Sequence, residues 1–250
     1  MARTPRARSE SDIYHAMNRG VGHCIIFEDD QDRREFLGIL ALKLKKYSAM
    51  LLAWCLMDNH YHLLLQVSYE DLPRLMHDVN LRYAQYFNRR YGRDGCLFGA
   101  RFKSEPITSD EHFLTVLRYI HRNPEKAGIA RTCEYRWSSY REYVKKPRLI
   151  SSKLALSMLS GKKGFRSFHD IDDPACDCID IHRDRGRQHF SDAEALEIAR
   201  VVLPDCGIEK IAGLLRTQRD KALRALKAVR LSVRQIARFT GISKTVVARA

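Results

Sequence analysis

The sequence predicts an α+β fold, a β-sheet with helices on one face, followed by a small all-α module. Strand-like and helix-like stretches alternate through residues 1–148, and residues 191–250 hold a basic helix and a helix-turn-helix pattern. Between them, residues 149–190 are rich in Ser, Gly, Lys and Asp and show little periodicity, which indicates a linker or a loosely ordered extension. The pattern therefore predicts two parts that fold separately.

Within residues 1–148 the expected elements follow the order β, α, β-hairpin, α, β, α. Extended stretches are expected at residues 13–19, 24–27, 49–57, 60–67 and 96–107, and helices at residues 32–47, 71–91 and 109–122. In the helix 71–91, apolar residues recur every three or four positions, Asp71 can cap the helix and Gly92 can end it. Residues 108–111 have capping-box spacing, and Asn123-Pro124 is expected to stop the third helix.

The charge balance and the apolar runs narrow the functional classes. The 250 residues contain 44 Lys and Arg against 30 Asp and Glu, a net charge of +14, which favours a polyanionic partner such as nucleic acid or an anionic membrane surface. The longest apolar run, residues 49–57, is far shorter than the roughly 20 residues of a membrane span. No apolar segment follows the basic N-terminus, so we expect neither membrane insertion nor secretion. Seven scattered cysteines fit a reducing cytoplasm better than a disulfide framework.

Two histidines stand two residues apart at the start of the expected strand 60–67. Because side chains alternate along a strand, His60 and His62 share one face and can both reach one divalent ion. A single His-x-His pattern, taken alone, is more often two partly exposed polar residues at the end of a strand. Tyr119 and Asn123 are spaced i, i+4 at the end of the third helix and project from one side of it. The apolar pattern of that helix allows Tyr119 to be either a core residue or part of a site.

Several separate motifs, in order along the chain, resemble one known family. They are YHAMNRG at residues 14–20, CLMDNHYHLL at 55–64, YAQYFNRR at 83–90, LF at 97–98 with RFK at 101–103, RYIHRNP at 118–124 and WSSY at 137–140. Over residues 11–143 the sequence resembles the single-tyrosine HUH transposases, and within them the REP-associated tyrosine transposase subgroup. The resemblance implies a ferredoxin-like or RRM-like sheet.

The resemblance also implies a site and a reaction. It identifies His60 and His62 as metal ligands, Asn123 as the residue that completes the metal site, and Tyr119 as the nucleophile. Attack of the tyrosine on a phosphodiester leaves a 3′-hydroxyl and a 5′-phosphotyrosine, whose bond energy allows rejoining without a nucleotide cofactor. The sequence holds no GxxxxGK[ST] loop, in agreement with this. A site of two imidazoles and an amide suits Mg²⁺ or Mn²⁺.

Two positions depart from the family pattern. Asp58 stands where the family has Pro, and it is either a turn residue, which we favour, or an additional acidic group near the metal. Gly99-Ala100 stands where the family often has Gln-Gly, which affects the local DNA contacts and leaves the catalytic residues intact.

The expected DNA contacts lie in both parts of the chain. Basic side chains near the site are candidates for phosphate contacts, namely Arg101, Lys103, Arg118 and Arg122. Tyr83 and Tyr86 fit the apolar stripe of their helix and are expected in the core. Residues 233–250 resemble a helix-turn-helix, with a positive φ expected at Gly241 and a recognition helix from Ser243 onward. Lys244, Thr245 and Arg249 would face DNA, whereas an ordinary helical hairpin is the alternative.

The expected function is that of a DNA transesterase acting on single-stranded or hairpin DNA, with duplex DNA bound by the C-terminal module, as a monomer or homodimer in the cytoplasm near the nucleoid. Two alternatives are a domesticated, non-cleaving hairpin-binding protein and a metal-dependent phosphodiesterase in which the histidines activate water. Cys176, Cys178 and His182 invite a zinc interpretation, but a cluster without metal fits their spacing better.

Overall fold

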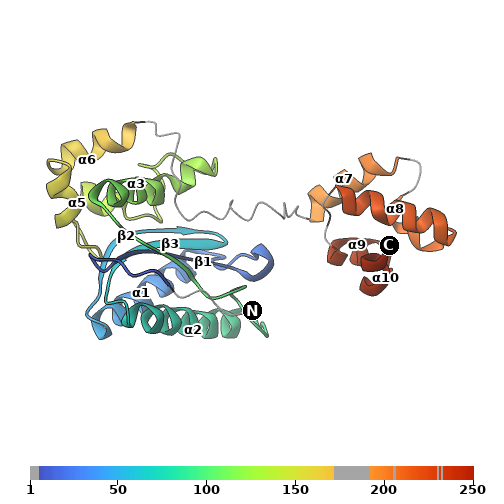
Figure 1. The fold of residues 1–250 in the computed structure, drawn as a ribbon, viewed down its shortest axis with the longest axis horizontal. Helices are drawn as coiled ribbons and strands as arrows, with labels where there is room; N and C mark the ends of the chain where they lie inside the picture. The colour runs from blue at the N-terminus through green and yellow to red at the C-terminus, as the bar shows by residue number, and fades with distance from the viewer. Residues whose placement is uncertain (1–5, 172–191, 205–206, 230, 232) are drawn as a thin grey trace. The chain divides into compact units, whose positions relative to one another are not determined.

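The computed structural model describes residues 6–171, 192–204, 207–229, 231 and 233–250 (Figure 1). The chain divides into two compact units, Met1–Asp180 and Ile181–Ala250, and each is described by itself. Among the described helices, none is long and apolar enough to cross a membrane.

The first unit is built around a four-stranded antiparallel sheet. Its strands are β1 (Ile13–Arg19), β2 (Met50–Met57), β3 (His60–Gln66) and β4 (Lys103–Pro106), in the spatial order β2-β3-β1-β4. Helix α1 (Asp30–Lys46) joins β1 to β2, and α2 (Asp71–Tyr91) joins β3 to β4. This connectivity is the ferredoxin-like βαββαβ arrangement. The predicted α+β class is therefore confirmed.

Strand alternation assigns the helices to the two faces of the sheet. Tyr61 of β3 meets Phe36 of α1 at 4.7 Å between ring centroids, and Phe36 in turn contacts Tyr83 of α2 at 5.2 Å. His62 projects to the opposite face, where its ring lies 5.5 Å from that of Tyr119 on α3 (Asp110–Lys126). The predicted placement on one face holds for α1 and α2, while α3 covers the other face, as Figure 1 shows.

Helix α3 runs through the proline that was expected to end it. Ser109 caps its N-terminus, since the Ser109 hydroxyl accepts a hydrogen bond from the His112 amide at 3.1 Å. The helix continues past Pro124 to Lys126, and the Ala127 amide still donates to the Asn123 carbonyl at 3.1 Å. Pro124 removes only its own amide donor, and it does so in the last turn, where few helical bonds remain to be lost.

The segment 24–27, expected to be extended, forms no strand. Residues Val21–His23 form the short 3₁₀ helix η1, and the chain that follows bonds to the β2–β3 turn. The amides of Ile26 and Phe27 both donate to the Asp58 carbonyl, at 2.8 and 3.0 Å. Of the expected extended stretch 96–107, only β4 is a regular strand. The apolar residues of these two stretches are therefore explained by burial of their side chains on the α2 side of the sheet, and not by pairing in a strand.

The prediction of a linker from residue 149 is wrong for residues 149–170. Helices α4 (Tyr140–Val144), α5 (Lys153–Met158) and α6 (Gly161–Asp170) pack together beside α3. Phe165 of α6 is fully buried and stacks on Tyr143 at 4.6 Å between ring centroids. A few apolar residues, Phe165 among them, hold this segment to the core although its composition is mostly polar. The remainder of the predicted linker, including Cys176, Cys178 and His182, lies outside the described residues.

A chain of hydrogen bonds joins α6 to α3 and β2. His169 Nδ1 donates to the Phe165 carbonyl (2.9 Å), which leaves His169 Nε2 to accept from His121 Nδ1 (2.9 Å). His121 Nε2 then accepts from the Ser139 hydroxyl (2.7 Å), whose oxygen accepts the Trp54 amide (2.9 Å). Burial lowers the pKa of His169 to about 4 and holds that of His121 well below its usual value. Both rings are therefore neutral and their tautomers are set.

The second unit is a helical module with its own core. It contains α7 (Asp192–Val202), the 3₁₀ helix η3 (Ile208–Gly213), α8 (Arg216–Ala228), α9 (Val233–Thr240) and α10 (Lys244–Arg249). Leu223, Ile236 and Val247 are fully buried in that core. Gly241 joins α9 to α10 with a φ of 70°, the positive value predicted for this position. Ser243 occupies the N-cap position of α10 without a capping bond from its side chain.

Candidate functional site

Three polar side chains meet on the α3 face of the sheet. His60 Nε2 lies 3.2 Å from Asn123 Oδ1, and His62 Nε2 lies 3.4 Å from Asn123 Nδ2. β3 supplies the two histidines from one face, as predicted, and α3 crosses that face with Asn123 in its last turn. All three are nearly or fully buried, with exposed fractions of 8%, 0% and 8%. The structure thus brings together residues that lie about sixty positions apart in the chain.

The outer nitrogen of each imidazole is held by a neighbour. His60 Nδ1 lies 2.7 Å from Asn59 Oδ1, and His62 Nδ1 lies 2.9 Å from His15 Nε2 on β1. Burial, together with the nearby His60 and His15, holds the pKa of His62 well below its usual value, so this ring is neutral and keeps a lone pair. Both rings therefore direct Nε2 toward Asn123 while Nδ1 is engaged elsewhere, the pattern typical of imidazole metal ligands.

The donor set offers a divalent cation two imidazole nitrogens and one amide oxygen. Among the described residues, no group of three His, Cys, Asp or Glu side chains could hold a metal ion, so a site here depends on the amide of Asn123 as its third protein ligand. Two imidazole nitrogens and an amide oxygen leave further coordination positions for water or phosphate oxygens.

Tyr119 lies beside this group on α3. Its ring is 5.5 Å from that of His62 and 6.0 Å from that of His15, in both cases edge to face, and its exposed fraction is 2%. Lys126, seven residues along the same helix, places its ammonium 4.7 Å from the centre of the Tyr119 ring. This contact is a cation–π interaction. The tyrosine is therefore both part of the packed face and adjacent to the three polar side chains.

The turn that precedes His60 is fixed from outside the sheet. Asp58 forms an ion pair with Arg33 of α1, and its carbonyl accepts the amides of Ile26 and Phe27 described above. The Asn59 carbonyl accepts the amide of Gly20 at 3.0 Å. The Asp58 side chain is 63% exposed and belongs to the turn, in agreement with the favoured interpretation of this departure from the family pattern.

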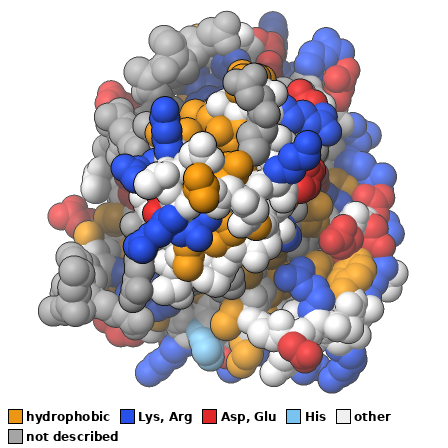
Figure 2. Space-filling model, turned by 90° about the vertical axis from the view of Figure 1, so that its right-hand side faces the viewer, with side chains coloured by type: hydrophobic (Ala, Val, Ile, Leu, Met, Phe, Trp, Pro, Cys, Tyr) orange, Lys and Arg blue, Asp and Glu red, His pale blue; other side chains and the backbone are white. Residues whose placement is uncertain are grey.

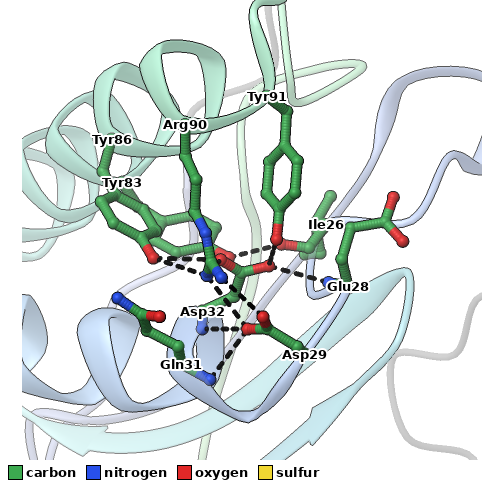
Figure 3. A network of polar contacts seen from close by, with 9 residues as sticks. All are labelled: Ile26, Glu28, Asp29, Gln31, Asp32, Tyr83, Tyr86, Arg90 and Tyr91. Carbon is green, nitrogen blue, oxygen red and sulfur yellow. Dashed lines mark hydrogen bonds and ion pairs between the residues drawn. The ribbon is translucent and has the colours of Figure 1, made fainter.

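A buried carboxylate anchors the segment that supports this turn (Figure 3). Asp32 of α1 is fully buried and accepts hydrogen bonds from the Glu28 amide (2.9 Å), the Tyr86 and Tyr91 hydroxyls (3.1 and 2.9 Å) and Arg90 (2.6 Å). Arg90 also pairs with Asp29 at 2.6 Å. The network ties residues 28–32 to the end of α2, next to Ile26 and Phe27.

The candidate DNA contacts fall into different environments. Arg101 and Lys103 are both exposed. Arg101 lies just before β4, and Lys103 is the first residue of β4. Arg118 and Arg122 of α3 instead donate to backbone carbonyls at the end of α6, those of Phe168 (3.2 Å) and Ile171 (3.0 Å).

The remaining candidates lie on α2 and α10. Thr245 is exposed on α10. The side chains of Lys244 and Arg249 lie outside the described part of the chain. Tyr83 is buried as predicted, and Tyr86 belongs to the Asp32 network.

Two residues near the site were not predicted. His15 reaches His62 only because β1 pairs with β3 in the register that sets His15 opposite Leu64. Strand register between distant segments has no local signal in one sequence. Lys126 was missed because the helix was expected to stop at Pro124, and the i, i+7 spacing to Tyr119 becomes visible once the helix continues.

Comparison with known proteins finds a similarity in the first unit. The family model described as Transposase IS200 like matches residues 11–123, a range that includes all four strands and α3 as far as Asn123. This match agrees with the predicted resemblance to tyrosine transposases over the same part of the chain.

Two solved structures are among those similar to the chain. A REP-associated tyrosine transposase bound to a REP hairpin is 14% identical with a TM-score of 0.47, covering 60% of this chain and 89% of that chain. A putative transposase from Deinococcus radiodurans is 16% identical with a TM-score of 0.34, covering 48% and 97%. No curated protein matches the chain at a significant level.

Proposed function

We propose that this protein is a transposase, a metal-dependent DNA transesterase of the REP-associated type, which cuts and rejoins single-stranded or hairpin DNA through Tyr119. The observation that carries the proposal is the convergence of His60, His62 and Asn123 beside Tyr119 on one face of the sheet. The six motifs that resemble the REP-associated subgroup support the substrate class.

The reaction needs a nucleophile and an electrophilic phosphodiester. The Tyr119 oxygen attacks phosphorus, a tyrosine–phosphate bond forms, and the bond to the 3′ oxygen breaks, leaving a 3′-hydroxyl. His60, His62 and Asn123 would hold Mg²⁺ or Mn²⁺, which when bound supplies Lewis-acid polarisation of the phosphodiester. Lys126 places its ammonium 4.7 Å from the centre of the Tyr119 ring, where it adds positive charge beside the nucleophile. Attack by a 3′-hydroxyl on the phosphotyrosine reverses the step, so no nucleotide cofactor is required.

The second unit supplies a further DNA contact in this proposal. Residues 191–250 hold 12 basic and 6 acidic residues, a net charge of +6. The α9–Gly241–α10 geometry supports a helix-turn-helix whose α10 carries Lys244, Thr245 and Arg249 toward duplex DNA. In the view of Figure 2, Lys and Arg side chains lie beside hydrophobic ones on the surface. The proposed domains are therefore a catalytic domain in residues 1–171 and a duplex-binding domain in residues 192–250.

Near the catalytic site, Arg101 and Lys103 are the proposed phosphate contacts because both are exposed. Arg118 and Arg122 stay candidates, in addition to their bonds to the end of α6. A DNA-acting protein of this kind works in the cytoplasm at the nucleoid, as a monomer or a homodimer.

A covalent adduct tests the proposal. We expect a labelled hairpin oligonucleotide with Mn²⁺ to shift the wild-type band in a denaturing gel, and Tyr119→Phe to abolish the shift while DNA affinity changes by a few-fold at most. Tyr140→Phe is the matched control, since Tyr140 is also buried but packs on His121 away from the site. Binding without any adduct would favour a non-cleaving protein. Cleavage without an adduct would favour a phosphodiesterase that activates water.

A further inference from the structure

A cleft of about 610 Å³ opens on the face of the sheet that α1 and α2 cover. One wall is α2, and the other is the segment between α2 and β4, with the N-terminal Arg6 beside it. The lining includes Arg6, Asn80, Gln85, Phe98, Arg101 and Phe102. The segment 97–103 carries the Leu-Phe and Arg-Phe-Lys motifs, and the chemistry at Tyr119 uses none of their side chains.

The two walls have different chemistry. Phe98 is half-buried with its ring edge to face against Tyr61 at 6.1 Å, and Phe102 continues the same aromatic wall. On the α2 wall, Asn80 and Gln85 present amides, and the Tyr61 hydroxyl donates to Asn80 Oδ1 and so fixes that side chain. A flat aromatic surface facing amide groups suits a nucleobase, which has a π face for stacking and donors and acceptors on its edge.

The cleft also has the charge that a phosphate requires. Arg6 and Arg101 both line it, and none of its lining residues is Asp or Glu. The Arg6 guanidinium lies 4.1 Å over the Phe102 ring and donates to Ser104 Oγ at 3.0 Å, which holds it at this position. Burial and the nearby Arg101 lower the pKa of Arg6, the mark of two cations close enough to repel each other. An anion placed between them relieves that repulsion.

The cleft lies at the end of the sheet where the proposed catalytic site begins. The Val21 amide donates to the Leu97 carbonyl at 2.9 Å, and Phe98 forms a bridge with Gly20 just after β1. The last residue of β1, Arg19, is paired with His60 in the β1–β3 register. The cleft and His60 therefore flank the same end of β1 on opposite faces. A single strand that passes around this end reaches both.

We propose that the cleft binds one unpaired nucleotide of the DNA substrate, with its base between the Phe98–Phe102 wall and the α2 amides and its phosphate on Arg6 and Arg101. The proposal rests on the proposed function for the class of substrate. It assigns a task to the Leu-Phe and Arg-Phe-Lys motifs, namely recognition of a base near the cleaved phosphate.

Binding of a fluorescein-labelled single-stranded dodecamer of mixed sequence, measured by anisotropy with the full chain, tests the assignment. Loss of stacking on an aromatic ring costs about 1–3 kcal/mol per base, so we expect Phe98→Ala to weaken binding about tenfold. Arg101→Ala should weaken it and reduce the salt dependence by about 0.7 in log K per decade, the value for one phosphate of a single strand. Arg82→Ala removes an exposed arginine of α2 outside the cleft and should change affinity less than twofold.

A second variant guards against misfolding of Phe98→Ala. Gln85 is exposed, so Gln85→Trp keeps the core and fills the cleft, and it should also weaken binding about tenfold. Affinity within twofold of wild type in both Phe98→Ala and Gln85→Trp overturns the proposal, as does an equal loss for a blunt duplex. The covalent adduct separates this result from the proposed function. Arg82→Ala, outside the cleft, should form the adduct as the wild type does. A wild type that forms no adduct but shows cleft-dependent binding refutes the reaction and leaves the cleft in place.

Discussion

Replacing Asp32 by Asn tests whether the buried network behind the β2–β3 turn stabilises the first unit. The carboxylate has no exposed surface and accepts four hydrogen bonds, two on each oxygen. An amide offers one oxygen and one NH₂ group, so in either orientation the NH₂ faces the Glu28 amide or the Arg90 guanidinium. At least one buried donor therefore loses its acceptor, and the ion pair with Arg90 loses its charge.

The cost can be estimated from these contacts. An unsatisfied buried donor costs about 1–3 kcal/mol, and breaking a buried ion pair by removing one partner costs about 3–5 kcal/mol. Arg90 is 26% exposed and keeps Asp29 as a partner, so the lower end applies, about 3 kcal/mol. For a unit of this size that loss lowers the melting temperature by roughly 6–12 °C.

Chemical and thermal denaturation followed by circular dichroism measure the loss. Asp78→Asn is the matched control. Asp78 accepts hydrogen bonds from three side chains, those of Lys43, Lys46 and Tyr47, but its own side chain is 24% exposed. Partly exposed pairs contribute up to about 1 kcal/mol, so this variant should melt within roughly 4 °C of wild type. A loss below 1 kcal/mol for Asp32→Asn, or equal losses for the two variants, would refute the reasoning.

Three further outcomes are expected. His60→Ala or His62→Ala should abolish adduct formation and the stabilisation of the wild type by Mn²⁺ in thermal melts, and activity of the wild type in excess EDTA would contradict this. Deleting residues 191–250 should leave adduct formation on a short hairpin unchanged, but it should weaken binding to duplex DNA and reduce the salt dependence of that binding. Loss of the adduct would instead place the tail in the catalytic part. Hydrogen bonds from Lys46, Lys43 and Tyr47 lower the pKa of Asp78, so its stabilising effect is present above the unfolded pKa of about 3.9 and is lost as pH falls through the folded value. Acid melts of Asp78→Asn should therefore show a shallower loss of stability below pH 4 than those of wild type.

Local patterns in the sequence predicted much of the first unit. The strand 13–19 and the helix 71–91 have the predicted bounds, because alternation, helical periodicity and the left-handed Gly92 are all encoded within a few residues. The pairing of His60 with His62 on one face follows from strand geometry alone. The approach of Tyr119 and Asn123 to that face was implied by the resemblance to a family and not by periodicity.

The errors arose where contacts between distant segments decide the structure. Pro124 normally ends a helix, yet here it stands in the last turn, where its missing amide removes few helical bonds. The segment 149–170 is polar on average, and only its docking on α3 and α4 shows that Phe165 and His169 are buried. The role of His15 depends on the register between β1 and β3, which no single stretch of sequence contains.

The hydrogen-bond chain from α6 to α3 has a mechanical consequence. In the sequence, the second unit follows Ile171, whose carbonyl accepts a hydrogen bond from Arg122, while the carbonyl of Phe168 accepts one from Arg118. Tension applied to that connection is borne first by these two arginines and by the His169–His121 pair, all of which attach to the helix that carries Tyr119. A pull transmitted through residue 171 would thus be delivered to α3, the helix that carries the proposed nucleophile Tyr119.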